Sequence, residues 1–76
     1  MSELLAFVAR SLVDHPEEVS VNENRQGQRV VLELRVHPDD MGRIIGRQGR
    51  TAKAIRSVMR AVAERQGERV TVEIVG

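Results

Sequence analysis

Hydrophobic residues follow two different periods along this chain of 76 residues, and the periods predict its elements. In the first 14 residues they recur three and four positions apart, which is typical of one face of a helix. Ser2 is suited to cap the start of that helix, and Phe7 is expected to pack in the core. Pro16 cannot continue a helix and restricts the residue before it, so the helix should end near Asp14.

Three later stretches alternate hydrophobic and polar residues, which predicts strands with one covered face. The first is short and centres on Val19 and Val21. A loop from Asn24 to Gln28, with Gly27 inside it, should lead into the second strand, residues 29–37. The third strand is expected over residues 69–75, and its covered face should consist of Val70, Val72 and Ile74.

Two helices are predicted between the second and third strands. Pro38, Asp39 and Asp40 favour the first turn of a short helix, so we interpret the aspartates as capping groups and not as an acid–base pair. A longer helix should cover residues 50–66 and end at Gly67. Its core face is expected to contain Ile55, Val58, Met59 and Val62.

The predicted order is α-β-β-α-α-β in a single domain, residues 1–76. A helical crossover between the second and third strands favours a parallel pair, whereas the first two strands should form an antiparallel hairpin. We therefore expect an α+β fold, with a three-stranded mixed sheet and the helices packed on one face.

A glycine turn, Gly46-Arg47-Gln48-Gly49, lies between the two middle helices. Glycine has no Cβ, so the backbone of such a turn can come close to a ligand. The helix that follows directs unpaired backbone N–H groups and a positive dipole end toward the same place. Arg47 and Arg50 flank the turn, which favours an anion such as phosphate.

The charge distribution supports an anionic ligand. The formal net charge is only +1, but residues 1–40 carry four basic and eight acidic residues. Residues 41–63 carry no acidic residue, and their six basic residues are Arg43, Arg47, Arg50, Lys53, Arg56 and Arg60. A local positive field of this kind attracts polyanions whatever the total charge.

Other glycine-containing motifs do not fit the turn. A P-loop needs a Gly-Lys-Ser/Thr ending after a strand, and a dinucleotide fingerprint needs Gly-x-Gly-x-x-Gly in the same place. A plain helix–helix corner would require the glycines for their backbone angles alone, but it would leave the basic cluster unexplained.

The segment GRIIGRQGRTAKAIR, together with the α-β-β-α-α-β order, resembles the type II KH domain, and in particular small bacterial proteins made of one such domain. KH domains clamp about four nucleotides of single-stranded RNA with a Gly-X-X-Gly loop. The resemblance implies that Gly46, Arg47, Gln48 and Gly49 contact the RNA backbone. It also implies that Ile44 and Ile45, with Ile55, support this loop or line a base groove.

We expect Arg43, Arg50 and Lys53 to add phosphate contacts. One position departs from the KH pattern, because Ala52 stands where many members carry a large aliphatic residue, and this leaves base selectivity open. The resemblance further implies a cytoplasmic RNA chaperone or post-transcriptional regulator that forms homodimers or pairs with a KhpB/Jag-type KH protein.

The long helix also carries a strip of small apolar residues beside its core face, and we predict a homodimer through it. The alternative is that Val58 simply completes the core. The residues of the predicted dimer interface are Ala54, Val58 and Ala61.

Several functions are not expected. No nucleophile–base pair or cofactor motif is present, so we predict neither an enzyme nor a cofactor. His15 and His37 lack companions at ligand spacing, and there is no cysteine, so no metal site is predicted. No stretch suggests a membrane span or a signal peptide. The rival hypothesis is a protein-interaction adapter that works through helix 50–66 and needs no RNA.

Overall fold

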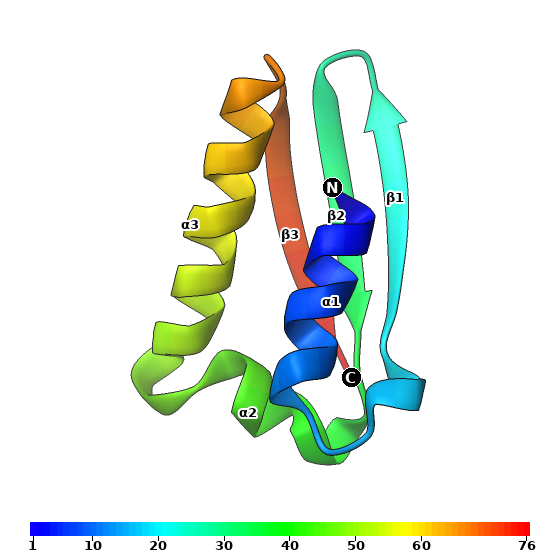
Figure 1. Ribbon diagram of the computed structural model, residues 1–76, viewed down its shortest axis with the longest axis vertical. Coiled ribbons are helices and arrows are strands. Elements are labelled where there is room, and N and C mark those ends of the chain that lie inside the picture. Colours follow the sequence, from blue (N-terminus) through cyan, green and yellow to red (C-terminus); the bar gives the residue numbers. More distant parts are fainter.

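All three helices lie on one side of a three-stranded sheet (Figure 1). The computed structural model describes residues 1–76. Its main elements are α1 (Ser2–Leu12), β1 (Ser20–Gln26), β2 (Arg29–Arg35), α2 (Met41–Ile45), α3 (Arg50–Arg65) and β3 (Arg69–Val75). Short 3-10 turns cover Pro16–Glu18, Pro38–Asp40 and Arg47–Gly49. The predicted α+β class and element order are therefore confirmed.

The strand β2 occupies the centre of the sheet, in the order β1-β2-β3. It pairs with β1 in antiparallel fashion and with β3 in parallel fashion, as predicted. Because α2 and α3 both lie in the crossover from β2 to β3, the glycine turn is held beyond the sheet, at the end where β2 finishes (Figure 1).

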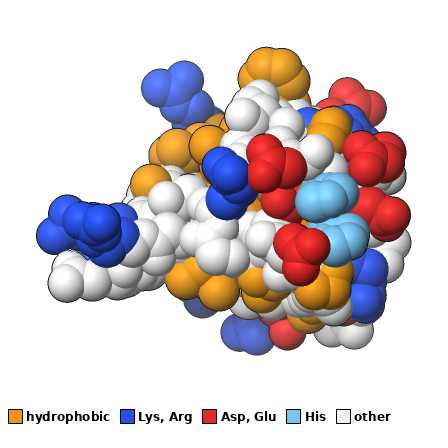
Figure 2. Space-filling view, turned by 90° about the horizontal axis from the view of Figure 1, so that it is seen from below, with side chains coloured by type: hydrophobic (Ala, Val, Ile, Leu, Met, Phe, Trp, Pro, Cys, Tyr) orange, Lys and Arg blue, Asp and Glu red, His pale blue; other side chains and the backbone are white.

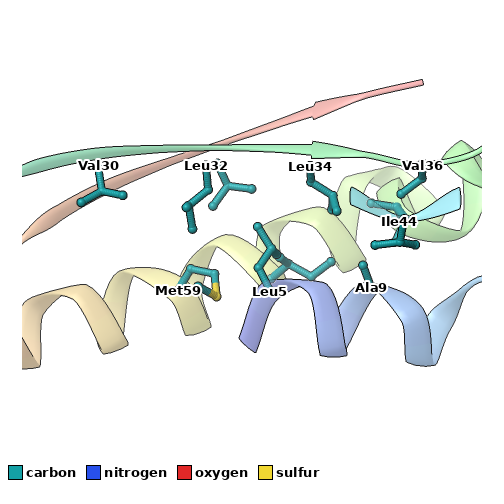
Figure 3. Close-up of a cluster of buried hydrophobic side chains, with 11 residues drawn as sticks. Leu5, Ala9, Val30, Leu32, Leu34, Val36, Ile44 and Met59 are labelled. Atoms are coloured by element: carbon teal, nitrogen blue, oxygen red, sulfur yellow. The ribbon is translucent and has the colours of Figure 1, made fainter. Parts of the chain in front are cut away.

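The core lies between the helices and the covered face of β2. Side chains from β2 point toward α1, α2 and α3, and every second residue of the strand is buried (Figure 3). Helix α1 contributes Leu5 and Ala9, which lie one turn apart, and α3 contributes Ile55 and Met59. The core residues from the rest of the chain include Val30, Leu32, Leu34, Val36, Ile44 and Val72.

The prediction that Phe7 belongs to the core is wrong, because 67% of its surface is exposed. Leu5 and Ala9 are both fully buried, so they lie on the face of α1 that packs against the sheet. Phe7 follows Leu5 by two positions, or about 200° around the helix, and so points away from the sheet. Phe7, the only Phe, Tyr or Trp of the chain, is thus exposed to solvent on the side of the molecule formed by the helices.

The ends of α1 also differ from the prediction. Ser2 is the first helical residue and not its cap, and no side chain caps this end. The helix ends at Leu12, and Val13 is already extended, before the 3-10 turn that begins with Pro16.

The hairpin is tighter than the predicted loop from Asn24 to Gln28. Strand β1 continues to Gln26, and only Gly27 and Gln28 form the turn. Gly27 has φ +59°, and a glycine with positive φ at the first turn position gives the two-residue turn favoured by twisted strands. The ladder therefore extends to the pair Gln26 and Arg29.

Helix α3 ends as the sequence predicts. Gly67 has φ +70°, and its N–H donates to the Glu64 carbonyl at 3.1 Å. The N–H of Glu68 donates to the Ala63 carbonyl at 2.8 Å. This pair of bonds is a Schellman motif, in which a left-handed glycine satisfies the last carbonyls of the helix and redirects the chain into β3.

Candidate nucleic-acid interface

The glycine turn joins α2 and α3 through three residues with positive φ. Gly46, Gln48 and Gly49 have φ values of +76°, +58° and +75°. Gln48 is the chain's single residue other than glycine with positive φ, which costs on the order of 1–2 kcal/mol for an L-residue. The turn is therefore a strained corner, held between two helices that are anchored in the core by Ile44 and Ile55.

The two glycines are needed for different reasons. A Cβ on Gly46 would lie 2.2 Å from Thr51 Oγ1 and 2.9 Å from the Thr51 backbone nitrogen. A Cβ on Gly49 would meet nothing within 4 Å. Gly46 thus permits the tight contact with the first turn of α3, whereas Gly49 faces open space that a ligand backbone can approach. Since positive φ at both glycines and the Thr51 contact at Gly46 explain these residues without a ligand, the case for an anionic ligand rests on charge.

The apolar residues beside the turn have separate roles. Ile44 is completely buried in the core, so it has no surface for a ligand. Ile45, next to Gly46, is 40% exposed, so its apolar side chain is open to a ligand. Ala52, where the chain departs from the KH pattern, is buried in the first turn of α3.

Most of the basic side chains near the turn have no acidic partner. Arg43 is the exception, because its guanidinium lies 3.0 Å from the Asp14 carboxylate. Arg50 donates to the Gln48 amide oxygen at 3.4 Å, a neutral contact that leaves its charge uncompensated. No carboxylate lies within ion-pair distance of the remaining members, Arg47, Lys53, Arg56 and Arg60. Seen from below, basic side chains gather at the projecting end of the molecule where the glycine turn lies (Figure 2).

Helix α3 offers further positive charge. Its first residue follows Gly49, and no side chain caps its N-terminus. The backbone donors of the first turn and the positive dipole end therefore point into the glycine turn. Farther along the helix, Arg56 and Arg60 line a hollow against β3, and Arg56 Nε donates to the Val72 carbonyl at 3.3 Å.

An apolar groove runs between α1 and α3. Its lining includes Val8 and Leu12 of α1 and Ala54 and Val58 of α3. The volume of the groove is about 370 Å³. Val58 is 50% exposed, so the alternative that it completes the core is wrong. Of the predicted dimer residues, Ala54 and Val58 line this groove, and Ala61 is exposed one turn farther along α3. The contribution of α1 was missed because the hydrophobic stripe of this helix was assigned entirely to the core.

The two histidines, distant in sequence, stack on each other with ring centroids 4.1 Å apart and an angle of 13° between planes. They lie side by side among acidic side chains (Figure 2). Ligand atoms of His15, His37 and Asp39 lie within 4.8 Å of one another. However, a metal ion lies close to the plane of an imidazole ligand at about 2 Å from its nitrogen, and stacked rings share no such position. We assign no metal site to this cluster.

Asp40, predicted as a helix cap, instead turns back toward the segment after α1. Its carboxylate is 1% exposed and accepts hydrogen bonds from the Asp14 and His15 backbone N–H groups at 3.1 and 3.0 Å. His15 Nδ1 lies 3.0 Å from the same carboxylate. Asp40 does occupy the N-cap position of α2, as the capping interpretation predicts, but its side chain makes no capping hydrogen bond there. The side chain that caps the 3-10 turn Pro38–Asp40 is that of His37, whose Nδ1 accepts a hydrogen bond from the Asp39 N–H at 3.0 Å.

A mixed three-stranded sheet with helices on one face, and a Gly-X-X-Gly turn between two of those helices, defines a KH domain. Residues 2–74 match the family described as KhpA/KhpB, KH domain. The chain belongs to this KhpA/KhpB family.

Curated relatives cover the full length. The chain is 52% identical over 75 residues to the RNA-binding protein KhpA of Halalkalibacterium halodurans, covering 99% of each chain. It is 53% identical to the RNA-binding protein KhpA of Clostridium acetobutylicum, covering 99% of this chain and 100% of that one. The family is thus one of RNA-binding proteins and not of enzymes, in line with the sequence prediction.

Solved structures show the same fold at low sequence identity. Era of Aquifex aeolicus, in a crystal structure of a variant bound to GDP.AlF4-, superposes with a TM-score of 0.65 at 22% identity. Era in complex with MgGDPNP and nucleotides 1506–1542 of 16S ribosomal RNA gives a TM-score of 0.59, also at 22% identity. In both cases the match covers 96% of this chain and 28% of Era.

None of the helices combines the length and the apolar character that a membrane-spanning helix requires.

Proposed function

We propose that this protein binds single-stranded RNA at the glycine turn and has no catalytic activity. The observation that carries the proposal is the uncompensated positive charge at the turn, where Arg47, Arg50 and Lys53 lack acidic partners. The relatives, which are named RNA-binding protein KhpA, support it. Phosphates would bind the backbone donors of the turn and the N-terminus of α3, and a base would rest on Ile45.

The binding should be weak and sensitive to salt. The site holds few phosphate contacts, and the chain's one aromatic residue, Phe7, lies on α1 outside it. Without stacking on aromatic rings, affinity depends mainly on phosphate contacts, and dissociation constants of about 10⁻⁴ to 10⁻⁶ M are expected. Such a protein gains from a second copy that engages the same RNA.

The test is fluorescence anisotropy with labelled single-stranded RNA across a salt series, comparing wild type with Arg47→Asp/Gln48→Asp. The matched control is Arg10→Asp/Ser11→Asp, which makes the same charge change at two exposed positions of α1. Binding should be lost in the turn variant and kept in the control. Equal loss in both would reduce the effect to net charge, and equal binding by all three would place the RNA site elsewhere.

The apolar groove supports a second role, self-association. We propose a homodimer in which Ala54, Val58 and Ala61 of α3, with Leu12 of α1, meet a second copy. Val58→Asp should give a monomer in sedimentation velocity at micromolar concentration, with unchanged circular dichroism. If the wild type is itself monomeric under these conditions, the homodimer is refuted. The same surface would then be tested for a KhpB/Jag-type KH partner, as an adapter requires.

The physiological role proposed from these properties is that of a cytoplasmic RNA chaperone or post-transcriptional regulator. Ultraviolet crosslinking in cells followed by sequencing of the bound RNA tests it. Crosslinks to many cellular RNAs that disappear in Arg47→Asp/Gln48→Asp support the role. An unchanged crosslinking pattern in this variant would contradict it.

A further inference from the structure

The open face of the sheet, opposite the helices, carries a second group of arginines. Arg29 begins β2 and Arg69 begins β3, and the two are direct partners in the parallel register. The Arg69 N–H donates to the Gln28 carbonyl at 2.8 Å, which fixes the starts of the two strands beside each other. Both side chains line one shallow hollow with Val31 and Thr71. On β1, the neighbours of Arg29 are the neutral amides Asn24 and Gln26.

These two arginines are not compensated, whereas the other strand arginines are. Arg25 forms ion pairs with Glu23 and Glu68, and Arg35 lies 3.6 Å from Glu33. Neither Arg29 nor Arg69 has a carboxylate within ion-pair distance. Like charges at facing positions of neighbouring strands repel. An anion bound between the two guanidinium groups would remove this repulsion and accept hydrogen bonds from both.

The arginine pair connects to the glycine turn by a continuous surface. Arg56 and Arg60 lie farther along α3 from the turn, and both line a hollow between α3 and β3. Thr71 of β3 lines that hollow and also the one that holds Arg29 and Arg69. Because β3 is an edge strand, nothing beyond it blocks the way from one face of the sheet to the other. The path follows the 16 residues of α3, about 24 Å at 1.5 Å per residue.

We propose that Arg29 and Arg69 form a second phosphate-binding site for the same RNA strand. The strand leaves the glycine turn, follows α3 past Arg56 and Arg60, crosses the edge of β3 at Thr71 and ends on the open face of the sheet. The inference rests on the proposed RNA binding at the turn and extends it. The chain would thus recognise a longer single strand than the roughly four nucleotides that a glycine turn clamps.

The test compares two labelled polyuridine RNAs, one of about four and one of about 12 nucleotides, within the range of single-strand binding sites. Arg29→Gln/Arg69→Gln removes the pair and keeps most of each side chain's length. The matched control, Arg10→Gln/Arg35→Gln, removes the same charge, with Arg35 on the same open face at the opposite end of β2. Thermal unfolding followed by circular dichroism verifies that each variant is folded.

Affinity of the Arg29/Arg69 variant for the longer RNA should fall about tenfold, with the short RNA bound as by wild type. The salt slope for the longer RNA should decrease by about 1.4, or about 0.7 for each lost phosphate contact. The control should bind both RNAs nearly as wild type does. An unchanged affinity for the longer RNA, or an equal loss for both lengths, would overturn the proposal.

The failure of the turn site and of the second site can be told apart. If Arg47→Asp/Gln48→Asp binds the longer RNA normally while Arg29→Gln/Arg69→Gln does not, the open face is the primary site and the proposed function of the turn fails. If only the turn variant loses binding at both lengths, the turn binds RNA and the second site does not exist.

Discussion

The buried carboxylate of Asp40 holds the imidazole of His15 at 3.0 Å and joins two segments that are 25 residues apart in sequence. The same carboxylate accepts the backbone N–H groups of Asp14 and His15, so it closes the chain after α1 onto the turn that precedes α2. Arg43 strengthens the connection from the other side through its ion pair with Asp14.

This contact predicts a stability that depends on pH. The hydrogen bond to Asp40 raises the pKa of His15 above its usual 6.5. Burial would raise the pKa of Asp40, but the Asp14 N–H and the bonds from His15 lower it below 3.8. The His15 contribution is therefore fully present below pH 6.5 and is lost as pH rises through its folded-state pKa. The Asp40 contribution is present above pH 3.8 and is lost as pH falls through its own folded-state pKa.

Urea unfolding at about pH 5 and about pH 8.5 tests the histidine part, because the lower value lies below the ordinary histidine pKa of 6.5 and the higher value favours the neutral imidazole. The wild type should lose more stability toward the higher pH than His15→Gln does, since the variant has no imidazole at this position to deprotonate. Equal losses in the two proteins would show that the Asp40–His15 contact contributes nothing to the pH dependence.

Substitutions of the two turn glycines should differ strongly. Gly46→Ala places a methyl group within 2.2 Å of the Thr51 side chain and 2.9 Å of its backbone, so a loss of several kcal/mol is expected. Gly49→Ala meets no atom and should cost only about 1–2 kcal/mol for its left-handed backbone. Urea unfolding of both variants checks the difference. Thr51→Gly should rescue Gly46→Ala only partly, because the backbone contact remains; similar costs at both glycines would refute the steric argument.

Truncation of Leu5 should cost much more stability than truncation of Phe7, although both are large apolar residues of α1. Leu5→Ala empties a fully buried position and should cost about 2–5 kcal/mol. Phe7→Ala removes a side chain that is 67% exposed and should change the stability of the monomer by no more than about 0.5 kcal/mol. Chemical denaturation at low protein concentration checks the pair. A large loss in Phe7→Ala would mean that Phe7 packs in the folded monomer.

The cap at the end of α3 gives a further prediction. Gly67→Ala keeps the helix but forces a residue with a Cβ into φ +70°, so stability should fall by about 1 kcal/mol. Gly42→Ala is the comparison, because Gly42 lies inside α2 without positive φ and without a neighbour near its missing Cβ. That change should be neutral or slightly stabilising. The thermal midpoints of the two variants test this; a fall in Gly42→Ala equal to that in Gly67→Ala would contradict it.

The sequence predicted what depends on local pattern. The structure has β2, α3 and the Gly-X-X-Gly turn in the order that the sequence predicts. Alternation predicted β2, helical period predicted α3, and Gly67 marks the end of that helix. The errors concern orientation and long-range contact. Periodicity shows that α1 has an apolar face, on which Leu5 and Ala9 lie, but it does not show how wide the buried part of that face is, and Phe7 lies outside it. Asp40 resembled a local cap, since its partner His15 is distant in sequence and only the fold brings them together.

The exposed edges of the sheet bear on how copies of this protein meet. Strand β1 has one free edge, and its last five residues are all exposed and polar or charged: Asn22, Glu23, Asn24, Arg25 and Gln26. At the opposite edge, Arg56 already occupies the Val72 carbonyl. Polar edge strands and occupied backbone acceptors oppose the addition of a strand from another chain. Addition of a strand is therefore disfavoured along β1 by its polar residues, and at β3 it would have to displace Arg56 from the Val72 carbonyl.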